Sequence, residues 1–145
     1  MHFVDTNVLV YARDDAEPWK RDRAREVMRR LWRTRQGRVS HQVLIEFYNT
    51  VTRKLSPGLP RDEAISDVRE LLVWEPVAPD SALFERAWQV EDRYRLSWWD
   101  SLIAAAALIQ DCQILHTEDL QDGMEIDGLR VVNPFGPAFD FRLLE

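Results

Sequence analysis

The sequence predicts an α/β domain in which a parallel sheet is flanked by helices on both faces. Two observations support this fold class. Short apolar segments that suit buried strands alternate with longer segments whose apolar residues recur at helical spacing, and strands separated by helices form parallel sheets. The chain has 145 residues, and no repeat, linker or low-complexity tract interrupts it. We therefore expect a single domain with one core.

The expected strands are short and mostly apolar. They cover residues 3–4, 38–40, 113–116 and 129–132. Residues 74–77 are a further candidate, which Pro76 would keep at an edge of the sheet because proline has no amide hydrogen to donate. Residues 8–12 are apolar and suit either a helix start or a strand, a choice that periodicity alone does not decide.

Amphipathic helices are expected between these strands. In the clearest one, residues 20–34, the apolar side chains fall at the spacing of one buried face, and Gly37 is expected to end it. Ser40 and Ser97 are candidate N-caps of two further helices, and Asp80 starts another. The helices after the first are expected from residue 40 to about 55, over 62–72, from 80 to about 90, and over 98–110.

Composition excludes several classes of protein. No apolar run approaches the roughly 20 residues that cross a bilayer, and the first residues do not resemble a signal peptide. Cys112 is the only cysteine, so an intramolecular disulfide is impossible and a reducing compartment is expected. His2, His41 and His116 are not at metal-ligand spacing, and we interpret them as structural or surface groups.

Charge is distributed unevenly along the chain. The net charge is −6, yet residues 13–38 contain ten Lys or Arg against five Asp or Glu. Such a segment could hold the phosphate backbone of a nucleic acid. The alternative is that its arginines are only the solvated face of a helix. The candidate backbone-binding residues are Arg21, Arg23, Arg25, Arg29 and Arg30.

Four acidic residues lie on separate predicted elements. Asp5 and Asp119 each follow a predicted strand, at the sheet edge where α/β proteins bind ligands. Asp100 is in the first turn of a helix, and Glu46 is in the second turn of another. Carboxylates that converge from separate elements suit Mg²⁺ or Mn²⁺, which can activate water for attack on phosphorus. Taken singly, each acid has another interpretation: Asp5 could only cap a helix, and Asp100 could be an acid favoured by the helix dipole. Glu46 could be a partly exposed surface acid, and Asp119 an ordinary loop acid.

Two adjacent tryptophans precede the last long helix. Trp98 and Trp99 could stack on nucleobases. The alternative is that they fill the core or an interface, which is the commoner role of such side chains.

At these positions the sequence resembles the PIN-domain ribonucleases, in particular the VapC-type toxins of prokaryotic toxin–antitoxin pairs. Each motif is weak alone, but the four acids occur in the family's order. The matching stretches are residues 4–11, 40–48, 97–106, 115–123 and 131–135.

The resemblance implies a five-stranded parallel sheet and a single-strand-preferring RNA endonuclease that needs Mg²⁺, for which Mn²⁺ can substitute. Asp5, Glu46, Asp100 and Asp119 would be both the catalytic and the metal-binding residues, and Thr6, Asn7 and Thr117 would support them. Glu118 and Asp122 are rivals for the role given to Asp119. The resemblance also implies a homodimer in the prokaryotic cytoplasm that is inhibited by a cognate VapB-like antitoxin.

The resemblance divides the chain at residue 135. It implies a PIN domain over residues 1–135, and residues 136–145 would be a C-terminal extension with no expected role beyond packing of Phe139, Phe141 and Leu143.

An apolar groove near Glu46 is expected to receive the antitoxin. Phe47, Tyr48, Trp74 and the helix over 62–72 would line it. The alternative is that these aromatic side chains fill the core.

Two other functions compete with the nuclease. A haloacid-dehalogenase-type phosphatase needs a second Asp two residues after the first, whereas Asn7 occupies that position here. A non-catalytic PIN-like module that binds RNA or protein would be expected to lose acids from the set, and all four are present. Glycine-rich phosphate loops are also missing from the sequence.

Overall fold

Five short strands form one mixed sheet with the order β2-β1-β3-β5-β4. The computed structural model describes residues 1–145. Four strands are parallel to their neighbours, and β4 runs antiparallel to β5. The strands are β1 (His2–Val4), β2 (Gly37–Arg38), β3 (Ile114–His116), β4 (Glu125–Ile126) and β5 (Leu129–Val132).

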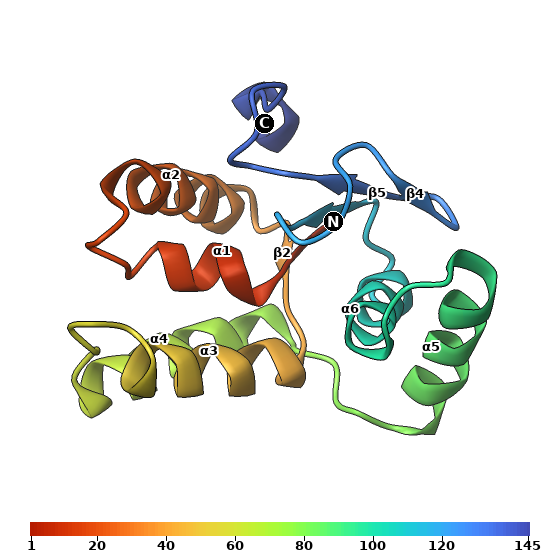
Figure 1. Ribbon diagram of the computed structural model, residues 1–145, viewed down its shortest axis with the longest axis horizontal. Coiled ribbons are helices and arrows are strands. Elements are labelled where there is room, and N and C mark those ends of the chain that lie inside the picture. Colours follow the sequence, from red (N-terminus) through yellow and green to blue (C-terminus); the bar gives the residue numbers. More distant parts are fainter.

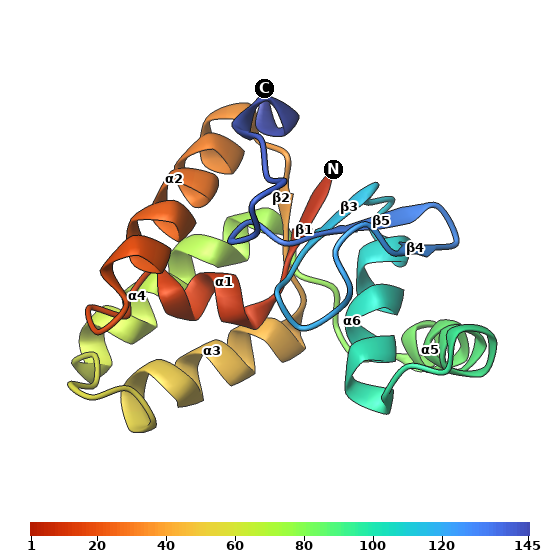
Figure 2. The same cartoon turned by 45° about the horizontal axis from the view of Figure 1, so that its top comes forward.

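Six α-helices surround this sheet (Figure 1). They are α1 (Thr6–Tyr11), α2 (Pro18–Thr34), α3 (His41–Arg53), α4 (Arg61–Leu71), α5 (Ser81–Tyr94) and α6 (Trp98–Ile109). Helices α1 to α4 gather on one side of the sheet, and the α5–α6 pair lies on the other side, as Figure 2 also shows. The predicted α/β class with helices on both faces is confirmed.

The predicted edge strand over 74–77 is wrong. The chain forms the 3-10 helix η1 (Leu72–Trp74) and then turns at Glu75, whose φ is 51°. Only Val77 pairs with a strand-like residue, in an isolated parallel bridge to Ser40. Pro76 cannot donate to a ladder, so no strand extends from this bridge.

The fifth strand is β4, which the sequence analysis did not predict. It joins β5 through a tight turn at Asp127 and Gly128, both with positive φ, as this dipeptide favours in hairpins. A two-residue strand contains no alternating pattern to detect. The sheet is therefore mostly parallel rather than wholly parallel.

Most helix ends agree with their predicted signals. Ser40 and Ser97 accept hydrogen bonds from Val43 N and Asp100 N, as expected of N-caps. The undecided segment over 8–12 is largely helical and belongs to α1. Helix α2 ends differently from the prediction, because Arg35 rather than Gly37 takes the left-handed cap conformation.

Gly37 lies in β2, where the Trp74 ring packs directly against its backbone. A Cβ atom at this position would collide with that ring. The glycine is therefore required by packing rather than by the end of α2.

The core is continuous between the sheet and both groups of helices. The alanine run over 104–107 is buried and brings α6 close to the sheet strands β3 and β5. No helix combines the length and apolar character that a membrane span needs.

The C-terminal residues pack against α2 through the 3-10 helix η2 (Phe141–Leu144). Leu144 is fully buried in the core. Phe139 and Phe141 meet edge to face, and the Arg30 guanidinium lies over the Phe141 ring. Packing of the two phenylalanines is as predicted, but the buried leucine is Leu144 rather than Leu143.

Candidate active site

The site begins where two neighbouring parallel strands end. The amide of Asp5, directly after β1, donates to the carbonyl of His116 at the end of β3. Asp5 is buried and also serves as N-cap of α1, because its carboxylate accepts a 2.7 Å hydrogen bond from Thr6 N. The strand pairing thus brings Asp5 beside Thr117 at the sheet edge.

Thr117 and Asn7 connect Asp5 to Asp119. The Thr117 hydroxyl donates to Asp5 Oδ2 at 2.8 Å. The Asn7 amide nitrogen donates to Thr117 Oγ1 at 3.0 Å and to Asp119 Oδ2 at 3.1 Å. These contacts orient the two aspartates around shared polar side chains.

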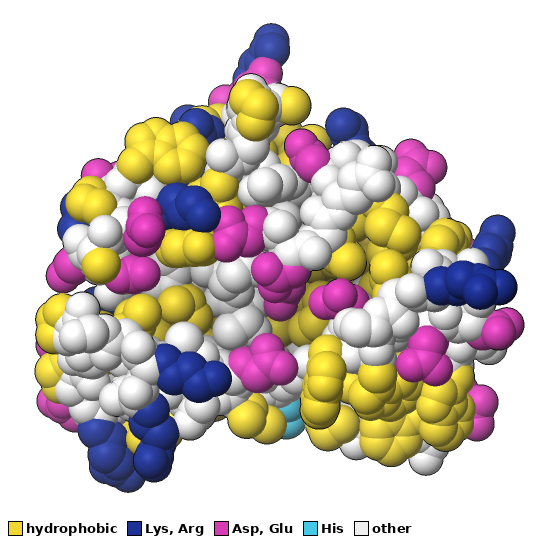
Figure 3. Space-filling model, in the orientation of Figure 1, with side chains coloured by type: hydrophobic (Ala, Val, Ile, Leu, Met, Phe, Trp, Pro, Cys, Tyr) yellow, Lys and Arg dark blue, Asp and Glu magenta, His cyan; other side chains and the backbone are white.

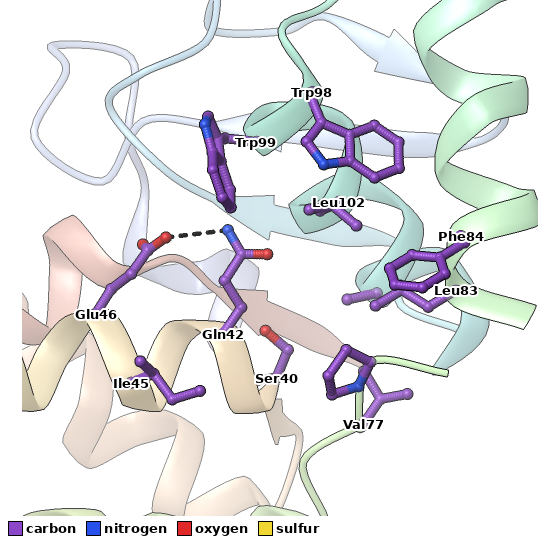
Figure 4. Close-up of a pocket in the computed structure, with 12 residues that line it drawn as sticks. Ser40, Gln42, Ile45, Glu46, Val77, Leu83, Phe84, Trp98, Trp99 and Leu102 are labelled. Carbon is purple, nitrogen blue, oxygen red and sulfur yellow. Dashed lines mark hydrogen bonds between the residues drawn. The ribbon is translucent and has the colours of Figure 1, made fainter. Parts of the chain in front are cut away.

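Glu46 joins this site from α3. Its Oε2 accepts a 2.9 Å hydrogen bond from the Thr6 hydroxyl, which follows Asp5 in the chain. Its Oε1 accepts a 3.0 Å hydrogen bond from Gln42 Nε2 (Figure 4). The sequence analysis missed Gln42, although its position one helical turn before Glu46 is the signal that could have found it.

Asp100 is not linked to the other three acids by hydrogen bonds. It lies in the first turn of α6, where its amide donates to Ser97 Oγ. Its carboxylate makes no hydrogen bond or ion pair with the protein. Of the four predicted acids, hydrogen bonds through intervening side chains therefore link Asp5, Glu46 and Asp119 but not Asp100.

The electrostatics of Asp5 reflect burial among like charges. Burial raises the pKa of Asp5 to about 7, opposed by the hydrogen bonds from Thr117 and Thr6 and reinforced by the nearby Asp119 and Glu46. No Lys or Arg forms an ion pair with any of the four predicted acids. The fold leaves this negative charge without a counter-ion from the protein.

A divalent cation fits this site in its chemistry. The side chains that meet here offer carboxylate, hydroxyl and amide oxygens, which Mg²⁺ and Mn²⁺ prefer, and Asp5 lacks a cationic partner. The arrangement is not a preformed cage, because no three Asp, Glu, His or Cys side chains lie close enough to hold an ion. Thr6, Asn7 and Thr117 stand between the carboxylates.

Comparison with protein families identifies the domain. The sequence model of the PIN domain matches residues 2–121. The chain belongs to the PIN domain family. Comparison with curated proteins finds no match.

Two solved structures share this PIN fold. A toxin–antitoxin complex from Klebsiella pneumoniae superimposes with a TM-score of 0.65 at 19% identity, covering 93% of this chain and 98% of that one. The VapBC2 complex from Rickettsia felis, bound to a DNA fragment from its promoter, gives a TM-score of 0.58 at 17% identity, with coverages of 90% and 96%. At such identities the likeness establishes the fold.

The two rivals of Asp119 have other partners in this PIN domain. Glu118 accepts from Lys20 Nζ at 2.8 Å and from the Tyr11 hydroxyl at 2.6 Å. Asp122 accepts from the amide of Asn133 at 2.9 Å and thereby fastens a loop. The backbone amide of Glu118 also donates to Asn7 Oδ1 at 3.4 Å, but of the three carboxylates only that of Asp119 is hydrogen-bonded to a side chain beside Asp5.

The predicted basic segment of this PIN domain forms much of α2, and most of its arginines have partners. Arg21 pairs with two aspartates, and Arg29 and Arg30 both pair with Glu26. Arg23 lies over the rings of Trp19, Phe139 and Phe141. Arg25 Nε donates to the carbonyl of Ala12.

Two apolar hollows of this PIN domain open onto the surface near Glu46. One, of about 520 Å³, is bounded by α3, α5, α6 and the chain around Val77 (Figure 4). Figure 3 shows apolar side chains gathered over α5 and the start of α6, at the lower right of that view. The other, of about 440 Å³, lies between α3 and α4 and is lined by Tyr48.

The predicted antitoxin groove is only partly supported by this arrangement. Phe47 and Trp74 are buried and belong to the core, so their assignment to a docking surface is wrong. Tyr48 does face the hollow between α3 and α4. The α-helical period places Phe47 inward and Tyr48 near the surface, a difference of one residue that the sequence analysis did not resolve.

Two of the three histidines form a buried pair between β1 and β3. His2 Nδ1 and His116 Nε2 lie 3.0 Å apart, and the rings stack with centroids 5.2 Å apart. Burial, with a smaller contribution from the N-terminal charge, lowers the pKa of His2 to about 4. Burial, with a smaller contribution from His2, lowers the pKa of His116 to about 3. Their role is structural, as predicted.

Proposed function

We propose that this PIN domain is a divalent-metal-dependent, single-strand-preferring endoribonuclease and the VapC-type toxin of a toxin–antitoxin pair. One observation carries the proposal. Asp5, Glu46 and Asp119 meet at the ends of β1 and β3 through shared polar side chains, and no cationic side chain neutralises them. The family membership and the fold shared with solved toxin–antitoxin complexes support the same assignment.

The side chains of the site have two roles: some would hold the metal ion, and others orient the carboxylates. Asp5, Glu46 and Asp119 would hold Mg²⁺ or Mn²⁺, and Asp100 is added by the sequence resemblance. Thr6, Asn7 and Thr117 orient the carboxylates through hydrogen bonds. The bound ion supplies activation of water and stabilisation of charge on the phosphate. The high proton affinity of Asp5 predicts that cation binding releases a proton near neutral pH.

Cleavage of single-stranded RNA by the purified full chain tests this function. We expect cleavage with Mg²⁺ or Mn²⁺ and none with EDTA. Asp119→Asn should lower kcat/KM by about 100-fold or more, the scale of losing one electrostatic group in an active site. The matched control is Asp122→Asn, since Asp122 fastens a loop and is not bonded to the site. Equal activity of the two variants would reject the assignment of Asp119.

A non-catalytic binding module is the second candidate. The observation in its favour is that no three acidic side chains lie close enough to hold an ion. Such a module would bind RNA or a protein partner with the same affinity in Mg²⁺ and in EDTA, and would leave the RNA intact. Absence of cleavage under both metals, with retained binding, would favour this candidate.

We propose that α2 contacts the RNA backbone. Arg25 is the most suitable of its arginines, because one of its nitrogens is anchored to a backbone carbonyl and no carboxylate pairs with it. Charge reversal of Arg21 and Arg25 should weaken RNA binding and flatten its dependence on salt. The logarithmic slope should fall by about 0.7 for each phosphate of single-stranded RNA that an arginine no longer neutralises. An unchanged slope would show that the RNA backbone does not contact these arginines.

We propose that a VapB-like antitoxin inhibits this protein and that the toxin is a homodimer in the prokaryotic cytoplasm. The hollow between α3 and α4 would receive an amphipathic segment of the antitoxin, with Tyr48 and Ile65 in its wall. Tyr48→Asp with Ile65→Asp should break a complex co-purified with the adjacent gene product. The control is Glu63→Gln, since Glu63 lies on α4 like Ile65 but does not line the hollow. Light scattering of the isolated toxin would measure its oligomeric state.

A further inference from the structure

The cavity bounded by α3, α5 and α6 adjoins the acidic site through Glu46 (Figure 4). We propose that it binds an unpaired nucleobase of single-stranded RNA, with Trp99 as the stacking surface. This inference rests on the proposed function, because it names how the same site selects its substrate. The cavity volume of about 520 Å³ lies within the range of about 300–1,000 Å³ that small-molecule sites occupy.

The aromatic side chains around the cavity differ in how they are supported. Trp98 is partly buried and packs against the rings of Phe84 and Trp88, at centroid distances of 6.4 and 6.2 Å. Trp99 lines the same cavity, is 65% exposed, and has no aromatic ring packed against it. The Trp98 cluster therefore forms a fixed wall, while Trp99 presents a ring face that lacks a stacking partner.

The polar groups of the cavity lie on α3. Ser40, Gln42 and Glu46 line its floor beside the apolar wall. Gln42 Nε2 is held by Glu46 at 3.0 Å, which leaves the carbonyl oxygen of the same amide without a partner in the protein. A base that stacks on Trp99 could donate a hydrogen bond to this oxygen, so the cavity offers both a stacking face and an edge contact.

Charge favours a base over a phosphate in this cavity. No Lys or Arg lines it, and its single charged residue is Glu46. A phosphate group would be repelled there, whereas an uncharged aromatic ring would not. Glu46 also belongs to the acidic site, where a bound divalent cation would offset the negative charge. A nucleotide with its base in the cavity would therefore place its sugar–phosphate at that site rather than among the apolar side chains.

A base in a duplex cannot use such a cavity, because both of its faces are already stacked and its pairing edge is occupied. The cavity thus gives a physical reason for a preference for single strands. It also predicts that the preference depends on Trp99.

Binding measured without divalent metal tests the inference separately from cleavage. The probe is a fluorescently labelled single-stranded RNA of mixed sequence, titrated with the full chain in EDTA. Trp99→Ala should weaken binding by about fivefold to 100-fold, the loss expected for one base–aromatic stack. Trp99→Phe should retain most of the affinity. The control is Ile109→Ala, since Ile109 is 38% exposed at the other end of α6 and does not line the cavity.

Two further probes identify the group that is bound. An oligonucleotide with abasic nucleotides should bind the wild type and Trp99→Ala equally, because it has no ring to stack. A duplex of the same sequence should also show no dependence on Trp99. Circular dichroism and sedimentation velocity of each variant report its fold and its oligomeric state.

The outcomes separate the inference from the proposed function. Trp99-dependent binding without cleavage in Mg²⁺ would reject the nuclease and retain the base site. If the wild type cleaves RNA but Trp99→Ala binds RNA as tightly as the wild type, or loses no more affinity than Ile109→Ala, the nuclease is retained and the base site is overturned. A shift of Trp99→Ala from dimer to monomer with unchanged RNA affinity would also overturn it, by showing that this face joins two copies of the chain.

Discussion

The arginines of α2 and the carboxylates at the carboxyl ends of β1 and β3 differ in whether the protein supplies partners of opposite charge. On α2, Arg21, Arg29 and Arg30 pair with carboxylates, and Phe139 and Phe141 cover Arg23. At the sheet edge, the predicted acids receive only neutral donors.

The comparison distinguishes charge that stabilises the fold from charge that is retained for a ligand. A helix rich in arginine looks like a binding surface in a sequence, but neighbouring acids absorb most of its charge. A few scattered acids look ordinary, but the fold concentrates three of them without a counter-ion. Variants at the two regions should therefore differ sharply, and the following predictions are ordered by the size of the expected effect.

The largest effect is expected for Asp5→Asn. RNA cleavage should fall by about 100-fold or more. The unfolding free energy without metal should rise, because a raised carboxyl pKa means that ionisation in the folded state costs stability as pH increases from about 4 through 7. The gain over the wild type should thus be greatest above pH 7 and vanish near pH 4. Urea unfolding in EDTA at several pH values measures this difference.

A loss of stability in Asp5→Asn at pH 8 would contradict this account. It would show that the hydrogen bonds from Thr117 and Thr6 outweigh the burial of charge. The buried charge of Asp5 would then not destabilise the fold, and the contrast with the paired charges of α2 would not hold.

The buried histidine pair should produce the next largest effect, with the opposite pH dependence. The folded-state pKa values of His2 and His116 lie below the unfolded value of about 6.5. Their stabilising contribution is complete above pH 6.5 and is lost as pH falls toward 4, by up to about 1.4 kcal/mol per pH unit for each imidazole. The measurement belongs in the Asp5→Asn background, where the opposing carboxyl is absent.

His2→Gln should reduce this acid sensitivity by about half, because one titrating group is removed. His41→Gln is the control, since His41 lies outside the pair. If His2→Gln and His41→Gln both lose stability at low pH as much as the Asp5→Asn protein does, the histidine pair does not control this loss.

Truncation of the Leu144 side chain tests whether η2 packs against α2. Leu144→Ala should lower the unfolding free energy by about 2–5 kcal/mol, the cost of truncating a buried leucine, with a value near the lower end because a terminal segment can relax. Leu143→Ala should cost less, because Leu143 is only partly buried. Equal losses in thermal or urea unfolding would show that η2 is not docked as described.

The smallest effect is expected for Arg29→Ala. Its ion pair with Glu26 is solvent-exposed, and such pairs contribute little to stability. The melting temperature should be unchanged within error. Arg13→Ala is the comparison, because Arg13 forms a two-fold contact with Asp67 of α4 and should show a measurable loss. A larger decrease in melting temperature for Arg29→Ala than for Arg13→Ala would contradict this prediction.

The sequence could predict what depends on period and on chain order. Apolar spacing located the long helices, and parallel strands necessarily end at one edge, which placed Asp5 beside Thr117 and near Asp119. Glu46 joins them because α3 packs against α1. Asp100 has no hydrogen bond to this group, and its position relative to the group depends on how α6 packs, which no local sequence pattern encodes.

Other features depend on side-chain geometry that a sequence does not contain. Strand β4 is too short to show alternation, and Pro76 next to apolar residues suggested a strand that does not form. The pairing of Arg21 with Asp15 spans a turn of the chain. The burial of Phe47 beside the accessible Tyr48 follows from the exact rotation of α3.

The register of β1 against β3 has a consequence for how the protein is made. Asp5 is completed by Thr117, which is 112 residues later in the chain, and the core also includes Leu144. On a ribosome, which delivers the chain from its N-terminus, β1 must wait for β3, and η2 can dock on α2 only after residue 144 has emerged. The acidic site is therefore assembled only after residues 114–119 have emerged, and a shorter nascent chain carries no finished site beside the messenger RNA that encodes it.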